Sequence, residues 1–133
     1  MKRIIYTNDE GGVSVIIPTG DLSIEEVAAK DVPAGVPFRI VSDDEIPSDR
    51  TFRNAWKDED GIKVDMPKAV EITKDRLRNE RAPLLTALDV QYQRAQESGL
   101  DTAAIIIEKQ RLRDITELAD KATTLDELKE ITA

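Results

Sequence analysis

The spacing of hydrophobic and polar positions changes near residue 66 of this 133-residue chain. Before that border, short apolar runs such as RIIYT and VSVIIPT are separated by clusters of Asn, Asp, Gly or Pro, which is typical of strands and turns. After it, apolar residues recur three, four or seven positions apart, which is the spacing of helices. The pattern therefore predicts an α+β protein with two differently built halves.

The first half predicts a small β-β-α-β sheet module over residues 1–47. The runs on either side of NDEGG indicate a β-hairpin with a loop of about five residues. Ser23 and Glu26 have the spacing of a capping box, so a short helix is expected to begin after Ser23 and to end before VPAG. FRIVS, residues 38–42, supplies a third strand, and three strands with a helix can form a stable unit.

The second half, residues 67–133, predicts an antiparallel helical hairpin with a short third helix. Pro83 lies inside the first long helix and is expected to kink or split it. The short link SGLD places the next helix, residues 101–122, antiparallel to the first. Thr124 and Glu127 form a second capping-box pattern before the last helix. One apolar stripe runs along the first helix: Val70, Leu77, Leu84, Leu88, Tyr92 and Ala95.

Three consecutive isoleucines, Ile105, Ile106 and Ile107, lie in the second helix of the predicted hairpin. At 3.6 residues per turn they span about 200° of the helix surface, so at least one of them should face away from the partner helix. The hairpin is therefore expected to rest on the N-terminal module, on a second copy of itself or on another protein.

The segment SDRTFRNAW lies in a predicted joint over residues 48–66. If a short helix begins at Arg50, Phe52 and Trp56 share one face, while Arg50 and Arg53 lie on another. Large aromatic side chains bury ~150–250 Å² each, so the segment could be an apolar plug that anchors the helical half to the sheet module. The less favoured alternative is an exposed Trp/Arg hot spot for a partner protein.

Composition and charge describe a soluble, acidic chain. Hydrophobic residues make up 40 % and charged residues 35 %, and the net charge of −8 argues against general affinity for nucleic acid or an anionic membrane. Cysteine and histidine are absent, which excludes disulfides, zinc sites of the usual ligand types and imidazole catalysis. The apolar run near the start is too short for a signal peptide or a membrane span, so synthesis in a cytoplasm is expected.

Candidate chemistry is sparse. The acidic runs at residues 43–45 and 58–60 lie in turn-like contexts and are expected to be solvated loops. DEDG lacks the twelve-residue register of a calcium loop, and NDEGG lacks the helix and lysine of a phosphate-binding loop. The charged residues of the first long helix alternate in sign and predict a solvent-facing, salt-bridged face. We therefore predict a non-enzymatic protein with no catalytic, cofactor-binding or metal-binding residues.

The order of three segments, RIIYTNDEGGVSVIIPT, IPSDRTFRNAW and VDMPKAVEITKDRLRNERAPLLTALDVQYQRAQESG, resembles a group of small proteins from tailed bacteriophages and prophages. Proteins of this group are associated with tail and tail-fibre genes. The most specific parts of the resemblance are DRTFRNAW, residues 49–56, and the helical hairpin LDVQYQRA…EKQRLRD. The closing TTLDELKEI also resembles the ends of tail-fibre assembly proteins. The resemblance implies a phage-tail context and supplies no catalytic residues.

Three hypotheses follow from this resemblance. A tail, baseplate or tail-fibre component of the virion, made in the host cytoplasm, would use both halves to contact other tail proteins. It would be present in three or six copies and could form a trimer or hexamer that fits tail symmetry. A tail-fibre assembly chaperone would bind a partner transiently and be absent from particles. A small acidic effector would bind a host protein during infection. The residues expected to bind partner proteins are Arg50, Phe52, Arg53, Trp56, Leu84, Leu88, Tyr92, Ile105, Ile106 and Ile107.

Overall fold

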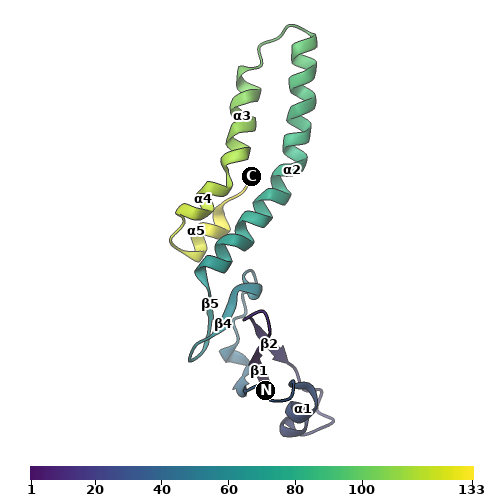
Figure 1. Cartoon of the computed structure of the whole chain (residues 1–133), viewed down its shortest axis with the longest axis vertical. Helices are drawn as coiled ribbons and strands as arrows, with labels where there is room; N and C mark the ends of the chain where they lie inside the picture. Colours follow the sequence, from purple (N-terminus) through teal and green to yellow (C-terminus); the bar gives the residue numbers. More distant parts are fainter. The chain divides into compact units, whose positions relative to one another are not determined.

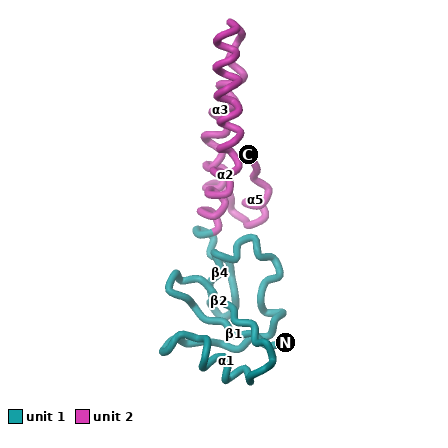
Figure 2. Tube along the Cα trace, turned by 90° about the vertical axis from the view of Figure 1, so that its right-hand side faces the viewer, with its two compact units in different colours: residues 1–68 teal, residues 69–133 magenta.

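The protein is described from a computed structural model that covers residues 1–133. The chain forms two compact units, residues 1–68 and residues 69–133 (Figure 2). Unit 1 contains the sheet and unit 2 is entirely helical, which confirms the predicted α+β class. The segment 48–66, expected to be a joint, belongs to unit 1.

Unit 1 is built on a three-stranded antiparallel sheet. Its strands β1 (Lys2–Thr7), β2 (Val13–Ile16) and β3 (Phe38–Ser42) lie in the order β2-β1-β3. The predicted hairpin and third strand are therefore confirmed. In the turn between β1 and β2, the Asn8 side-chain oxygen accepts hydrogen bonds from the backbone N–H groups of Glu10 and Gly12.

One face of this sheet is covered by helix α1 (Ile24–Asp31). The hydroxyl of Ser23 accepts a hydrogen bond from the backbone N–H of Glu26, as the capping-box pattern predicted. Ile4 of β1 is fully buried against Val27 of this helix. An amphipathic helix thus closes the first core of unit 1.

The opposite face is covered by a second hairpin that the sequence pattern did not predict. Strands β4 (Trp56–Asp58) and β5 (Ile62–Val64) pair with each other directly after the short 3-10 helix η2 (Arg53–Ala55). Trp56 packs against Ile5 of β1 in a second core cluster. The central sheet therefore lies between α1 and the β4–β5 hairpin.

Unit 2 is formed largely by helix α2 (Met66–Glu97), which starts in the last residues of unit 1. This helix runs without interruption for 32 residues and includes Pro83, so the expected split does not occur. Its axis changes direction near the middle of its length (Figure 1), and Pro83 lies near the middle of its sequence. Proline removes one backbone hydrogen bond and crowds the preceding turn, which accounts for a bend.

The rest of unit 2 consists of helices α3 (Ala103–Asp114), α4 (Thr116–Lys121) and α5 (Leu125–Glu130). Helix α3 runs antiparallel beside α2, as predicted (Figure 1). The single helix expected over residues 101–122 is instead interrupted at Ile115, whose N–H donates to the carbonyl three residues earlier. The predicted N-cap of α5 is confirmed, because the Thr124 hydroxyl accepts a hydrogen bond from the N–H of Glu127. The Glu127 carboxylate accepts from the N–H of Thr123 rather than from that of Thr124, so the capping box is not closed.

The helices of unit 2 surround a compact core and are also joined by polar contacts to backbone carbonyls. Arg76 of α2 donates to the carbonyl oxygens of Leu128 and Ile131, at 3.1 Å and 2.8 Å, and so holds the end of α5. Arg81 donates to the carbonyls of Leu112 and Arg113 at the end of α3. Cationic side chains at a helix C-terminus donate hydrogen bonds to carbonyls that have no partner within the helix, and they interact favourably with the negative end of the helix dipole. The fully buried core residues are Ala69, Thr73, Leu77, Leu112, Ala119 and Leu128.

Candidate protein-docking surfaces

The α2–α3 hairpin has one well-defined inner contact. The Lys109 ammonium of α3 lies 2.6 Å from a carboxylate oxygen of Asp89 and 5.0 Å from the centre of the Tyr92 ring, both in α2. The Lys109 side chain is only 15 % exposed, so its methylene groups pack between the helices. Ile105 and Leu112 precede and follow Lys109 by four and three residues, which places them on the same side of α3.

The two isoleucines that follow Ile105 are turned out of this contact. Ile106 is 50 % exposed and Ile107 is 70 % exposed, whereas Ile105 is half-buried. Successive residues are rotated by about 100° around a helix, so three neighbours cannot all face α2. The expectation that at least one of them faces away from the partner helix is confirmed.

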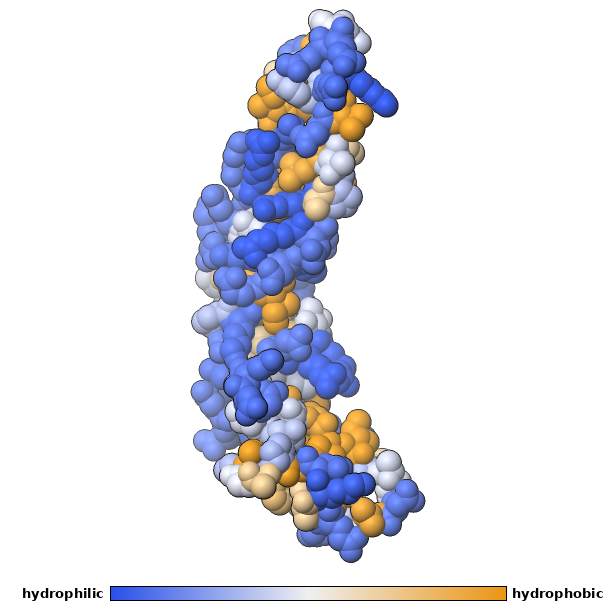
Figure 3. All heavy atoms as spheres, turned by 45° about the vertical axis from the view of Figure 1, so that its right-hand side comes forward, coloured by the Kyte–Doolittle hydropathy of each residue, from blue (hydrophilic) through white to orange (hydrophobic).

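Further apolar side chains are exposed on the same hairpin. Leu84 and Val90 of α2 are 43 % and 44 % exposed, and Leu100 in the α2–α3 loop is 67 % exposed. The predicted residues Leu88 and Tyr92 are half-buried. Figure 3 shows apolar residues, in orange, gathered toward the loop end of the hairpin. We refer to one set as the exposed hairpin residues: Leu84, Val90, Leu100, Ile106 and Ile107.

Leu118 of α4 was not among the predicted candidates, although it is 50 % exposed. It lines two shallow hollows, one continuing to Lys121 and the other to Ile131 beyond α5. Its neighbour Ala119 is fully buried, so the apolar pattern of this segment indicated the core and gave no sign of a second, outward face. The structure shows that α5 packs beside α4 but leaves Leu118 exposed.

The segment SDRTFRNAW divides into a buried part and an exposed part. Phe52 and Trp56 are 4 % and 1 % exposed, so neither presents the exposed aromatic surface of the hot-spot alternative. Trp56 plugs the space between the central sheet and the β4–β5 hairpin, inside unit 1. Arg50 and Arg53 are exposed, as expected if they lie on a different face from Phe52 and Trp56.

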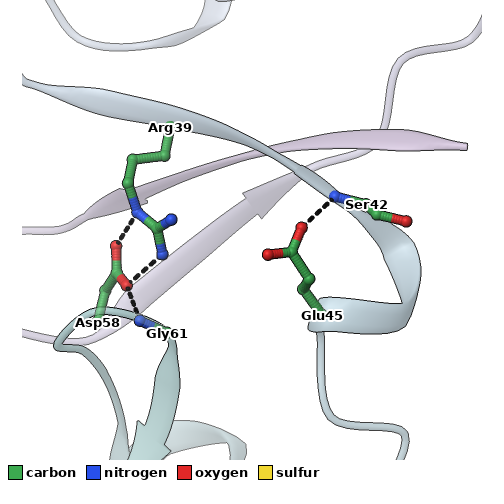
Figure 4. Close-up of polar contacts among 5 residues, drawn as sticks. All are labelled: Arg39, Ser42, Glu45, Asp58 and Gly61. Atoms are coloured by element: carbon green, nitrogen blue, oxygen red, sulfur yellow. Dashed lines mark hydrogen bonds and ion pairs between the residues drawn. The ribbon is translucent and has the colours of Figure 1, made fainter.

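The β4–β5 hairpin that carries Trp56 is fastened to β3 by an ion pair. The Arg39 guanidinium donates two hydrogen bonds to the Asp58 carboxylate, at 2.9 Å and 2.6 Å (Figure 4). These bonds, with a smaller contribution from the Gly61 backbone N–H, hold the pKa of Asp58 below its ordinary value. In the same close-up, the Glu45 carboxylate accepts a hydrogen bond from the backbone N–H of Ser42, which ties down the turn after β3.

Comparison of the chain with known protein families, with curated proteins and with solved structures found no match. None of the helices has both the length and the apolar character needed to cross a membrane.

Proposed function

We propose that this chain is a non-enzymatic structural protein of a bacteriophage tail, located in the tail, baseplate or tail-fibre region of the virion. It acts by contacts with other proteins. The observation that carries the proposal is the exposure of Ile106 and Ile107 on a hairpin whose inner face is already occupied. The resemblance of DRTFRNAW and the hairpin sequence to phage tail-associated proteins supplies the biological context.

The exposed hairpin residues favour docking for an energetic reason. Full burial of an isoleucine or leucine side chain contributes about 1.5–3 kcal/mol. Ile107 is still mostly exposed to water, so most of this stabilisation would be gained only when a partner covers it. Apolar residues gathered on one surface are typical of protein–protein contacts, whereas isolated ones are common on any protein. A partner that covers Ile106, Ile107 and Leu100 together would gain from all three.

The partner is another tail or tail-fibre protein, or further copies of this chain. An amphipathic helix commonly binds by placing its apolar side chains in a groove of its partner. Tail structures have threefold or sixfold symmetry, so three or six copies per particle are expected. Closed rings of identical subunits require one surface of each copy to fit a different surface of the next.

Quantitative mass spectrometry of purified particles tests this function, using isotope-labelled peptides of this chain and of a tail protein as standards. Presence at three or six copies, resistant to high-salt washing, is the expected result. Absence from particles would contradict it. Absence combined with loss of soluble tail fibre after gene deletion would instead identify an assembly chaperone. Normal particles without the protein, and a host protein bound to it, would identify an effector.

A further inference from the structure

A hollow of about 260 Å³ in unit 1 brings three arginines together. Arg3 comes from β1, while Arg50 and Arg53 come from the segment before β4. Asp43 is the one acidic residue in the lining, so the hollow has an excess of two positive charges, three arginines against one aspartate. The chain as a whole has a net charge of −8. This local reversal of sign favours an anionic ligand.

The three guanidinium groups have unused hydrogen-bond donors. Arg50 and Arg53 are exposed, and their side chains form no ion pair or hydrogen bond within the protein. The Nη2 atom of Arg3 is 4.0 Å from an oxygen of Asp43, and its Nη1 atom is enclosed without any partner. The Asp43 carboxylate is also 3.6 Å from the amino group of Met1. Enclosed donors without a partner are rare in folded proteins and require an explanation.

The remainder of the lining is mostly apolar. Val15, Ile46, Pro47 and Trp56 border the same space as the arginines. Pockets for drug-sized ligands usually enclose about 300–1,000 Å³, so this smaller hollow suits one or two side chains rather than a cofactor. A ligand that fits both parts of the lining has a carboxylate next to an aliphatic group.

A neighbouring hollow of about 390 Å³ on the same unit differs in its chemistry, although Arg53 lines it as well. Two of its polar side chains are already engaged: the Asn8 amide donates to Ser14 and accepts from the turn, and the Lys68 ammonium donates to the Glu10 carbonyl. Arg53 is shared by both hollows, but Arg3 and Arg50 line only the first one. The arginine hollow is therefore the stronger candidate site.

We infer that the arginine hollow, lined by Arg3, Arg50 and Arg53, binds a carboxylate of an acidic, partly aliphatic peptide segment of a partner protein. Guanidinium groups bind carboxylates through paired, charge-assisted hydrogen bonds, and the apolar lining accepts the neighbouring aliphatic side chain. A nucleic acid or an anionic membrane would extend beyond the hollow over the rest of this acidic surface and be repelled by it, whereas a short peptide segment can be confined to the hollow. This contact is one part of the proposed docking function. That the partner is a protein rests on the proposed function.

A titration of the full-length chain tests the site. The probe is an acetylated, amidated hexapeptide of alternating glutamate and leucine, and the control peptide has glutamine in place of glutamate. Trp56 is the only tryptophan and lines the hollow, so its single indole N–H signal in nitrogen-15 NMR spectra reports occupancy. We expect a saturable shift with the acidic peptide that weakens as salt increases, and at least tenfold weaker binding of the glutamine peptide.

The double variant Arg50→Gln/Arg53→Gln should weaken binding at least tenfold, with an unchanged circular dichroism spectrum because both side chains are exposed and unpaired. Arg94→Gln/Arg113→Gln removes the same charge from exposed positions of unit 2 and should bind like the wild type. Equal binding of both peptides, or equal loss in both double variants, would overturn the inference. So would the absence of any shift at millimolar peptide.

Sulfate, titrated alone and in competition with the peptide, separates a peptide site from a small-anion site. We expect sulfate to compete only weakly, because it lacks the aliphatic group. Sulfate that binds as tightly as the peptide would overturn the assignment to an acidic segment. The titration needs no phage particle, so its failure would leave the particle composition as an independent result, and absence from particles would leave the titration standing.

Discussion

Ile4 and Ile5 are neighbours in β1, yet they are buried on opposite faces of the same sheet. Ile4 is 0 % exposed beneath α1, and Ile5 is 1 % exposed beneath Trp56 and the β4–β5 hairpin. Successive side chains of a strand point to opposite faces, so both faces of β1 need a cover. The core of unit 1 is therefore completed only by residues that follow the β-β-α-β segment.

This arrangement predicts how unit 1 responds to truncation. A chain of residues 1–47 lacks Trp56 and leaves the Ile5 face in water, so it should not form a stable fold. A chain of residues 1–68 keeps both covers and should give dispersed amide signals in nitrogen-15 NMR spectra and a cooperative thermal transition. A folded 1–47 chain would show that α1 alone suffices to stabilise the sheet.

Trp56→Ala should destabilise unit 1 by about 3–5 kcal/mol, because it removes a large buried side chain and leaves a cavity. Urea unfolding followed by the amide signals of β1 measures this loss. Trp56→Phe keeps part of the aromatic packing and should lose less. A midpoint for the alanine variant close to that of the wild type would mean that the plug contributes little.

The ion pair between Arg39 and Asp58 predicts a pH dependence of unit 1. The pKa of Asp58 is lowered in the folded state, chiefly by hydrogen bonds from Arg39, so near this pKa the unfolded chain binds more protons. The stabilisation is present above the ordinary value of 3.8 and is lost as the pH falls through the lower folded-state value. It is modest, since Arg39 is partly exposed to solvent.

Asp58→Asn should therefore lower the stability of unit 1 at pH 7. The stability of the variant should also decrease less than that of the wild type as the pH falls from about 5 to about 2. Trp56 fluorescence during urea unfolding at several pH values measures both effects. The pKa of Asp44 is also lowered, through a hydrogen bond from Ser42, so part of the acid dependence should persist. Parallel stability curves for variant and wild type from pH 7 to pH 2 would contradict the role of Asp58.

Lys109→Ala should loosen the α2–α3 hairpin. The change removes the ion pair with Asp89 and the contact with the Tyr92 ring, and a cation–π contact contributes about 0.5–2 kcal/mol. Amide hydrogen exchange in α3 should become several-fold faster. Lys121→Ala, at an exposed position of α4, is the control. Equal exchange rates in wild type and Lys109→Ala would mean that other contacts hold the hairpin.

The sequence pattern predicted the elements with strong periodic signals and missed those without them. Asp60 and Gly61 both have positive φ values, 52° and 131°, and an Asp-Gly pair is a hairpin signal. Yet WKD and IKV, the strands beside it, are only three residues long and too short to show an alternating pattern. For this reason the sequence pattern predicted a solvated acidic loop at residues 58–60, where the structure has the turn of the β4–β5 hairpin.

The polar contacts of unit 2 could not be predicted for a different reason. The charges of α2 were expected to form a solvent-facing surface, and Arg78 with Asp75 fits that expectation. Arg76 and Arg81, however, donate to backbone carbonyls of α3 and of the α5 end, which lie 31 to 55 residues away in the chain. Every residue has a carbonyl, so side-chain identity gives no sign of such acceptors.

The final prediction concerns the exposed hairpin residues. Ile107→Glu places a charge on a side chain that is 70 % exposed, so the fold of unit 2 should be nearly unaffected. If the proposed docking surface includes this position, burying the new carboxylate against an apolar partner would be strongly unfavourable. Incorporation into particles should therefore fall at least tenfold. If copies pair through the hairpin, the purified variant should have the mass of a monomer.

Ala29→Glu is the matched control, because it adds the same charge at an exposed position of α1 in unit 1. Quantitative mass spectrometry of particles and light scattering of the purified protein measure the two effects, and circular dichroism verifies that both variants are folded. Ile106→Glu should behave like Ile107→Glu, since Ile106 is also exposed. Wild-type incorporation and mass for both isoleucine variants would exclude this side of α3 as the docking surface and would leave Leu118, on the neighbouring helix α4, as the next position to test.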